Sequence, residues 1–148
     1  MYKHILVPTD GSKLSAKAVK QAEQFAKSVG AKLTALHVSQ EYRALMDEGF
    51  ALPAFNTLKK RFDEQNAKRS SALLESVKTS ADKAGVRCDC VAVVNNLPYD
   101  AIIKQARKAK CDLIMMASHG RRGLSSLLLG SETSKVLTHS NIPVLVVR

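Results

Sequence analysis

The sequence contains no tryptophan, and its three tyrosines, Tyr2, Tyr42 and Tyr99, lie far apart. It therefore offers no aromatic platform on which single-stranded bases could stack. It also lacks an apolar run near the roughly 18 residues that a membrane helix needs, and Pro8 and Asp10 interrupt its apolar N-terminus. We expect neither a secretion signal nor a membrane span.

Cysteine is scarce as well. Cys88, Cys90 and Cys111 fit neither an even disulfide framework nor the paired C-x-x-C spacing of zinc sites. Reduced thiols in a cytoplasmic protein are therefore expected, with Cys88 and Cys90 on one face of a strand. A chain of 148 residues is long enough to build a hydrophobic core without disulfide or metal cross-links, and we expect a single domain over 1–148.

Acidic residues are few: 13 Asp and Glu stand against 23 Lys and Arg, a net charge of +10. Such an excess raises the question of nucleic acid or a small anionic ligand. Many of the basic residues lie in helix-patterned segments among Glu, Asp and Gln. These are Lys59, Lys60, Arg61, Lys68, Arg69, Lys104, Arg107, Lys108 and Lys110. This mixture is typical of solvated helix faces, so nucleic acid is not expected as a partner.

Short apolar runs alternate with amphipathic segments along the whole chain. The runs predict strands at residues 4–8, 33–38, 86–94, 112–117 and 144–147. The amphipathic segments predict helices at 14–29, 56–84, 98–110 and 131–140. Gly30 and Gly85 end the first two helices. This alternation predicts an α/β fold, an open parallel sheet with helices on both faces.

Two polar loops follow predicted strands: PTDGS after 4–8 and ASHGRRG after 112–117. In open parallel sheets ligands bind beyond the carboxyl ends of the strands, where the strand order reverses. If these two strands are neighbours there, the loops face one crevice. Glycines and a helix N-terminus suit phosphate, and a carboxylate such as that of Asp10 suits ribose hydroxyls. The second loop and the helix after it supply glycines, hydroxyls and cations: Gly120, Arg121, Arg122, Gly123, Gly130, Ser131, Thr133 and Ser134.

These glycines match neither G-x-x-x-x-G-K-[ST] nor G-x-G-x-x-G. A plain connecting loop, with Ser131 as a helix N-cap, therefore stays open. Ser118 and His119 are a weak candidate for a nucleophile and its base, because chain neighbours rarely face each other. Three further histidines have no metal-ligand spacing to a carboxylate or cysteine, and core or surface roles are expected for them. They are His4, His37 and His139.

Three stretches carry a family resemblance: VPTDGS, LHV and the C-terminal SHGRRGLSSLLLGSETSKVLTHSNIPVLVVR. With the order of elements, they resemble the universal stress protein family over essentially the whole chain. The resemblance implies an open five-stranded parallel sheet in the order 3-2-1-4-5, a Rossmann-like fold of the adenine nucleotide alpha hydrolase type. It also implies a cytoplasmic homodimer joined through the last strand, Val144–Val147. One branch of the family binds ATP or AMP, and the other does not.

The ATP-binding branch is marked by glycine, two residues, glycine, nine residues, and then glycine with serine or threonine. Gly120, the nine residues 121–129 and Gly130 with Ser131 match, whereas Ala117 stands in place of the first glycine. Alanine is the smallest side chain after glycine, so a weakened rather than abolished site is expected. The resemblance implies that Pro8, Thr9 and Val38 border the adenine and that Asp10 holds the ribose. It places Gly120, Arg121, Gly130, Ser131 and Glu132 around the phosphates; Ala117, His119 and Thr133 complete the predicted site.

The resemblance implies ATP or AMP as ligand, with Mg²⁺ or Mn²⁺ as a candidate companion ion. It further implies that a dimer passes its nucleotide state to an unidentified protein partner in a stress response. The alternative is a dimeric interaction module of the same fold that binds no nucleotide. The S-G-G-x-D-S motif of related pyrophosphatases is missing after the first strand. At most slow ATP hydrolysis is therefore expected, and no catalytic residue is predicted.

Overall fold

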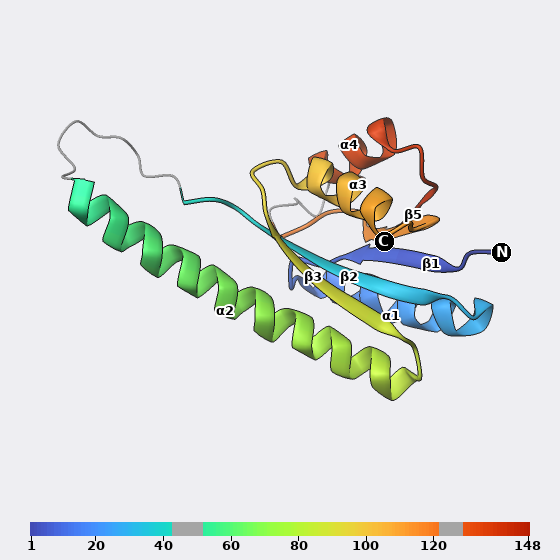
Figure 1. The fold of residues 1–148 in the computed structure, drawn as a ribbon. Helices are drawn as coiled ribbons and strands as arrows, with labels where there is room; N and C mark the ends of the chain where they lie inside the picture. The colour runs from blue at the N-terminus through green and yellow to red at the C-terminus, as the bar shows by residue number, and fades with distance from the viewer. Residues whose placement is uncertain (43–51, 122–128) are drawn as a thin grey trace.

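The computed structural model describes residues 1–42, 52–121 and 129–148. The strands are β1 (His4–Pro8), β2 (Lys32–Ser39), β3 (Cys88–Val94), β4 (Leu113–Ala117) and β5 (Val144–Val147). The helices are α1 (Lys13–Val29), α2 (Leu52–Ala84), α3 (Pro98–Lys108) and α4 (Ser131–His139). All neighbouring strands pair in parallel, in the order β3-β2-β1-β4-β5 (Figure 1). The predicted α/β class and strand order are confirmed.

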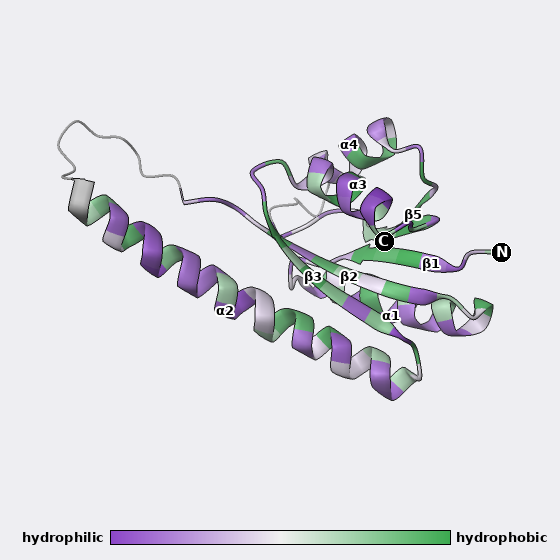
Figure 2. Ribbon diagram, in the orientation of Figure 1, coloured by the Kyte–Doolittle hydropathy of each residue, from purple (hydrophilic) through white to green (hydrophobic). Residues whose placement is uncertain are grey.

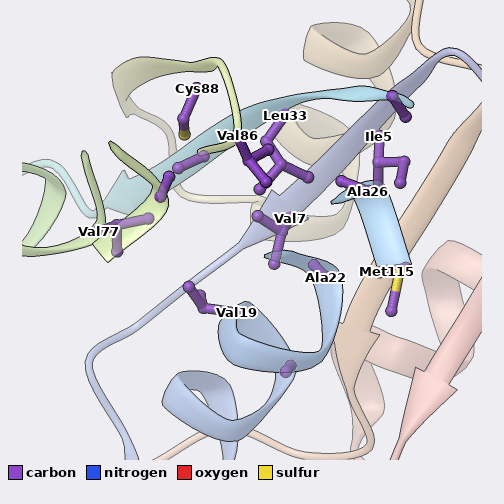
Figure 3. Packing of buried hydrophobic residues seen from close by; sticks show 14 of the residues in the cluster. Ile5, Val7, Val19, Ala22, Ala26, Leu33, Val77, Val86, Cys88 and Met115 are labelled. Carbon is purple, nitrogen blue, oxygen red and sulfur yellow. The ribbon is translucent and has the colours of Figure 1, made fainter. Parts of the chain in front are cut away.

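Helices cover both faces of the sheet, as a parallel sheet requires. On one face, side chains of α1 and α2 pack with one side of the strands in a cluster that includes Val19, Val77 and Leu33 (Figure 3). On the other face, α3 and α4 pack with the opposite side of the strands. The central strands β1 and β4 are buried almost throughout, which explains their nearly continuous apolar sequences.

Most predicted boundaries lie within two residues of the observed ones, and the differences have local causes. Val86 lies in the turn that ends α2, where its N–H donates to Ala81 O, so β3 begins at Cys88 rather than 86. Asp112 precedes β4 because its carboxylate accepts the N–H groups of Lys3 and His4.

Two predicted helices also differ at one end. The second begins at Leu52 rather than 56, with a proline near its start, where a missing N–H costs nothing. The third ends at Lys108 because Lys110 adopts a left-handed φ of 56°.

The N-terminal half of α2 projects past the sheet, and polar residues dominate its surface (Figures 1 and 2). Between this helix and the ends of β2 and β3 lies a cleft of about 690 Å³. Its walls carry small side chains, including Ser39, Ala67, Ser71 and Ala92. The cleft includes none of the twelve residues predicted to bind nucleotide.

Candidate functional site

The loop after β1 is folded largely by its own side chains. Asp10 Oδ1 accepts the N–H of Ser12 at 2.9 Å, an Asx turn that redirects the chain from strand to helix. Ser12 is the N-cap of α1, and its hydroxyl accepts the N–H of Ser15 at 3.2 Å. The buried hydroxyl of Thr9 shares a 3.0 Å hydrogen bond with that of Ser15. The short segment T-D-G-S therefore specifies its own conformation.

The chain around β4 is held instead by residues distant in sequence. The N–H of Ser118 donates to Val147 O at 2.8 Å, and that of Gly130 donates to Ser118 O at 2.7 Å. The Thr133 hydroxyl donates to Ala117 O at 3.0 Å, which ties α4 to the end of β4. These contacts hold the start of α4 against the end of β4, where the chain leaves the sheet.

Gly130 makes a close approach to the backbone. A Cβ built on it would lie 3.1 Å from Cα of His119 and 3.3 Å from the Ser118 carbonyl oxygen. Its φ of −71° is open to any residue, so the need for glycine is steric rather than conformational. Gly130 is also the N-cap of α4. The alternative in which Ser131 caps this helix is therefore wrong, since Ser131 is its first helical residue.

Asp10 joins the two loops. Its Oδ2 accepts the N–H of Arg121 at 2.8 Å while Oδ1 accepts that of Ser12, so one carboxylate is bonded to both loops. A Cβ on Gly120 would lie 2.7 Å from Oδ2, so this contact needs glycine there. Burial opposes ionisation of Asp10, but the hydrogen bonds from Ser12 and Arg121 outweigh it and lower its pKa. The ionised carboxylate is an acceptor only, the chemistry that a hydroxyl donor requires.

The methyl group of Ala117 lies in the hydrophobic cluster on the α1 side of the sheet, and the residue is 8% exposed. The carbonyl oxygen of Ala117 is taken by Thr133. The side chain that replaces the first glycine of the nucleotide-binding marker is thus accommodated by the core.

Glu132 faces α3 rather than the loop after β1. Its Oε2 accepts the N–H of Tyr99 in the first turn of α3 at 2.9 Å, and its Oε1 accepts the Lys135 ammonium at 3.0 Å. This carboxylate satisfies a helix N-terminus that has no side-chain cap of its own. Of the contacts with phosphates predicted for Glu132, only one through its backbone N–H is therefore available.

The remaining predicted residues lie at the same edge of the sheet. Pro8 ends β1 and is half-buried, and Val38 packs against the cluster under α3 and α4. His119 and Ser118 do face each other, contrary to expectation, with 3.2 Å between Nδ1 and the Ser118 oxygen. Ser118 is only 3% exposed, however, so the pair presents no accessible nucleophile. Gly123 and Arg122 lie outside the described residues.

His37, for which the sequence predicted a core or surface role, lies in this region. It is buried near the end of β2, and its Nδ1 shares a 2.7 Å hydrogen bond with the Ser70 hydroxyl on α2. Burial lowers its pKa; Asp10 opposes this shift, and Arg121 adds to it. The L-H-V segment alone gave no signal for this, because the arginine and aspartate approach it only in the folded chain.

The metal-ligating side chains that the structure describes do not gather into a metal centre. Among the described residues, no three His, Cys, Asp or Glu side chains are grouped to hold an ion. All three thiols are free, and burial raises the pKa of Cys88 to about 12 and that of Cys111 to about 11. Such thiols are protonated and weakly reactive at neutral pH. Within the described ranges, no helix is long and apolar enough to cross a membrane.

The strand order reverses between β1 and β4, and the two loops described above meet there, which defines a doubly wound α/β protein with its candidate site at the switch point. A model of the universal stress protein family matches residues 1–148. The chain belongs to the universal stress protein family.

Individual relatives agree with this. Universal stress protein MJ0531 of Methanocaldococcus jannaschii is 33% identical over 148 residues, covering 100% of this chain and 83% of that protein. The solved structure of MJ0577 from the same organism matches with a TM-score of 0.84 and 31% identity, covering 99% of this chain and 96% of that one. A universal stress protein solved in complex with cAMP matches with a TM-score of 0.71 and 27% identity, over 99% and 97% of the two chains.

Proposed function

We propose that this universal stress protein binds an adenine nucleotide, ATP or AMP, where the ends of β1 and β4 meet. The observation that carries the proposal is the Asp10 carboxylate, which bridges both loops from the point where a ribose would lie. The 27% identical relative solved with cAMP supports an adenine nucleotide as the ligand class.

The residues present suit such a ligand. Gly130 keeps a side chain away from the His119 backbone and Gly120 keeps one away from the Asp10 carboxylate, so N–H groups of this loop can face phosphates. The methyl of Ala117 packs into the core and does not fill the crevice. Among the described residues no three His, Cys, Asp or Glu side chains are grouped to hold an ion, so a companion Mg²⁺ or Mn²⁺ would take most of its oxygens from the phosphates and water.

Equilibrium dialysis with labelled ATP and AMP tests the proposal. Asp10→Asn is expected to weaken binding by about tenfold or more, because a hydrogen bond to a charged group contributes about 1.5–3 kcal/mol. Asp112→Asn is the matched control. That carboxylate also accepts two backbone N–H groups and also has a lowered pKa, but it lies at the opposite end of the sheet. No saturable binding below about 1 mM, or equal losses in both variants, would refute the proposal.

We further propose the functional setting that the resemblance implies: a cytoplasmic homodimer that passes its nucleotide state to a protein partner during stress, with at most slow ATP hydrolysis. The apolar edge strand β5 supports the dimer, because Leu145 is 38% exposed on an edge that pairing would cover. Leu145→Asp is therefore expected to give monomer or insoluble protein in light scattering. Val94→Asp on the other edge, where Val94 is 57% exposed, is expected to leave the dimer intact. An unchanged dimer in the Leu145 variant would contradict β5 pairing.

A nucleotide-free interaction module remains the second candidate, favoured by alanine at the first marker position. Mass spectrometry of natively purified protein separates the two, since co-purified ATP, ADP or AMP would exclude the module.

A further inference from the structure

The outer face of α1 carries an unusual set of charges. Four lysines of this helix are exposed: Lys13, Lys17, Lys20 and Lys27. The single acid of the helix, Glu23, is only 5% exposed and accepts the Ser80 hydroxyl of α2 at 2.9 Å. The exposed surface of α1 therefore presents four positive charges and no negative one.

The other helices differ in this respect. Each has at least one lysine paired with an acid three or four positions away: Lys59 with Asp63, Lys78 with Asp82, Lys104 with Asp100, and Lys135 with Glu132. Within the described part of the chain, no salt bridge joins a lysine of α1 to an Asp or Glu side chain; Lys17 donates to the backbone oxygen of Arg148 at 2.6 Å. The basic residues that the sequence pattern explained as solvated faces lie on α2 and α3, except for Lys110, which follows α3. The lysines of α1 are a separate group.

These four lysines form one stripe. At 3.6 residues per turn, positions 13, 17, 20 and 27 fall within about 80° of the helix circumference and extend over about 21 Å. Gln24 lies on the same line, in the gap between Lys20 and Lys27. We call these four residues the α1 lysine stripe.

The residues around the stripe restrict what it can bind. The other exposed side chains of α1 are Ala16, Gln21, Gln24 and Ser28. No exposed aromatic or large apolar side chain is present there to stack on bases or to enter a lipid layer. Lysines without arginine act as point charges for phosphates rather than as bidentate readers of base edges.

We propose that the α1 lysine stripe binds the phosphate backbone of double-stranded nucleic acid without reading its sequence. The stripe is straight, carries charge of one sign and is flanked by small or uncharged side chains. These properties suit the regularly spaced phosphates of a duplex. With four phosphates neutralised, the logarithm of the binding constant should fall with the logarithm of salt concentration with a slope of about −3.6. That slope corresponds to about 150-fold weaker binding in 200 mM than in 50 mM salt.

Fluorescence anisotropy with a labelled DNA duplex of mixed sequence, titrated at several KCl concentrations, tests this. The variant K13Q/K17Q/K20Q/K27Q removes the stripe. The control K59Q/K78Q/K104Q/K135Q removes the same charge from lysines that already have acidic partners. Circular dichroism and thermal unfolding verify that both variants fold.

The stripe variant is expected to lose at least about tenfold in affinity at 50 mM KCl and most of the salt slope, whereas the control stays within about threefold. Equal losses in the two variants would assign binding to net charge and overturn the proposal. Absence of binding by the unmodified protein at 20 mM KCl, or binding only to vesicles of equal parts phosphatidylserine and phosphatidylcholine, would do the same. The titration is carried out with no nucleotide present, so its outcome does not depend on nucleotide binding at Asp10.

Discussion

The loops after β1 and β4 reach the same crevice but are held by different kinds of interaction. Asp10, Ser12 and Ser15 bond to one another within six residues, so the first loop is organised by local side chains. The second depends on Val147 and on residues of α4, which are distant in sequence from β4. Substitutions in the second loop should therefore disturb tertiary structure, and those in the first should disturb one helix end.

The largest effect is expected from Gly130→Val. Branched carbons would enter a space where even a Cβ lies 3.1 Å from the His119 backbone, and overpacking of this kind costs about 1–3 kcal/mol. Gly11→Ala in the first loop is the comparison. Its φ of 78° makes alanine strained by about 1–2 kcal/mol, but the nearest atom is the end of the flexible Arg121 side chain. Urea unfolding measures both, and a smaller loss for Gly130→Val would contradict the steric argument.

Thr133→Val should have the next largest effect. The change keeps the shape of the side chain but leaves the buried Ala117 carbonyl without this donor, at a cost of about 1–3 kcal/mol. Ser12→Ala, which removes the N-cap of α1, should cost about 1 kcal/mol. Thermal unfolding of the two variants measures which loss of stability is larger. A larger loss for Ser12→Ala would contradict the view that the long-range hydrogen bond contributes more than the local cap.

Ala117→Gly separates stability from ligand binding. Removing a methyl from the core and adding backbone freedom should destabilise the fold by about 1 kcal/mol. Nucleotide affinity should stay the same or rise, because the methyl points away from the crevice. A loss of affinity without loss of stability would place the methyl against the ligand instead.

The smallest effect is expected from pH. Since folding lowers the pKa of His37, the unfolded chain binds a proton more readily below about pH 6.5, and stability should fall as pH drops from about 7.5 to 5.5. His37→Gln should flatten this dependence. His4→Gln is a second variant at the opposite end of the sheet; the pKa of His4 is also lowered by burial, so this change should flatten a further part of the dependence. Asp10 has a lowered pKa, so its contribution to folding stability is lost in a separate pH range, as pH falls below about 4 and the carboxylate becomes protonated.

Much of the fold was readable from the chain. Continuous apolar runs at 4–8 and 112–117 predicted buried central strands, and Gly30 and Gly85 end helices in left-handed conformations as expected. The family marker identified the edge where Asp10 and Gly120 meet. The turn of Glu132 toward α3 could not be predicted, because Tyr99 is 33 residues away in sequence and no local pattern couples them.

The elements, the sheet and the local turn at Asp10 could be predicted from the chain, since periodicity and short-range hydrogen bonds depend on neighbours in sequence. The folded structure was needed to show that the Ala117 methyl packs in the core, that Gly130 must be small, and that His37 lies near Asp10 and Arg121. It also separated the lysines of α1 from every acidic partner among the described residues. Each of these outcomes depends on which distant residues share a face or an edge, and folding of the chain establishes that proximity.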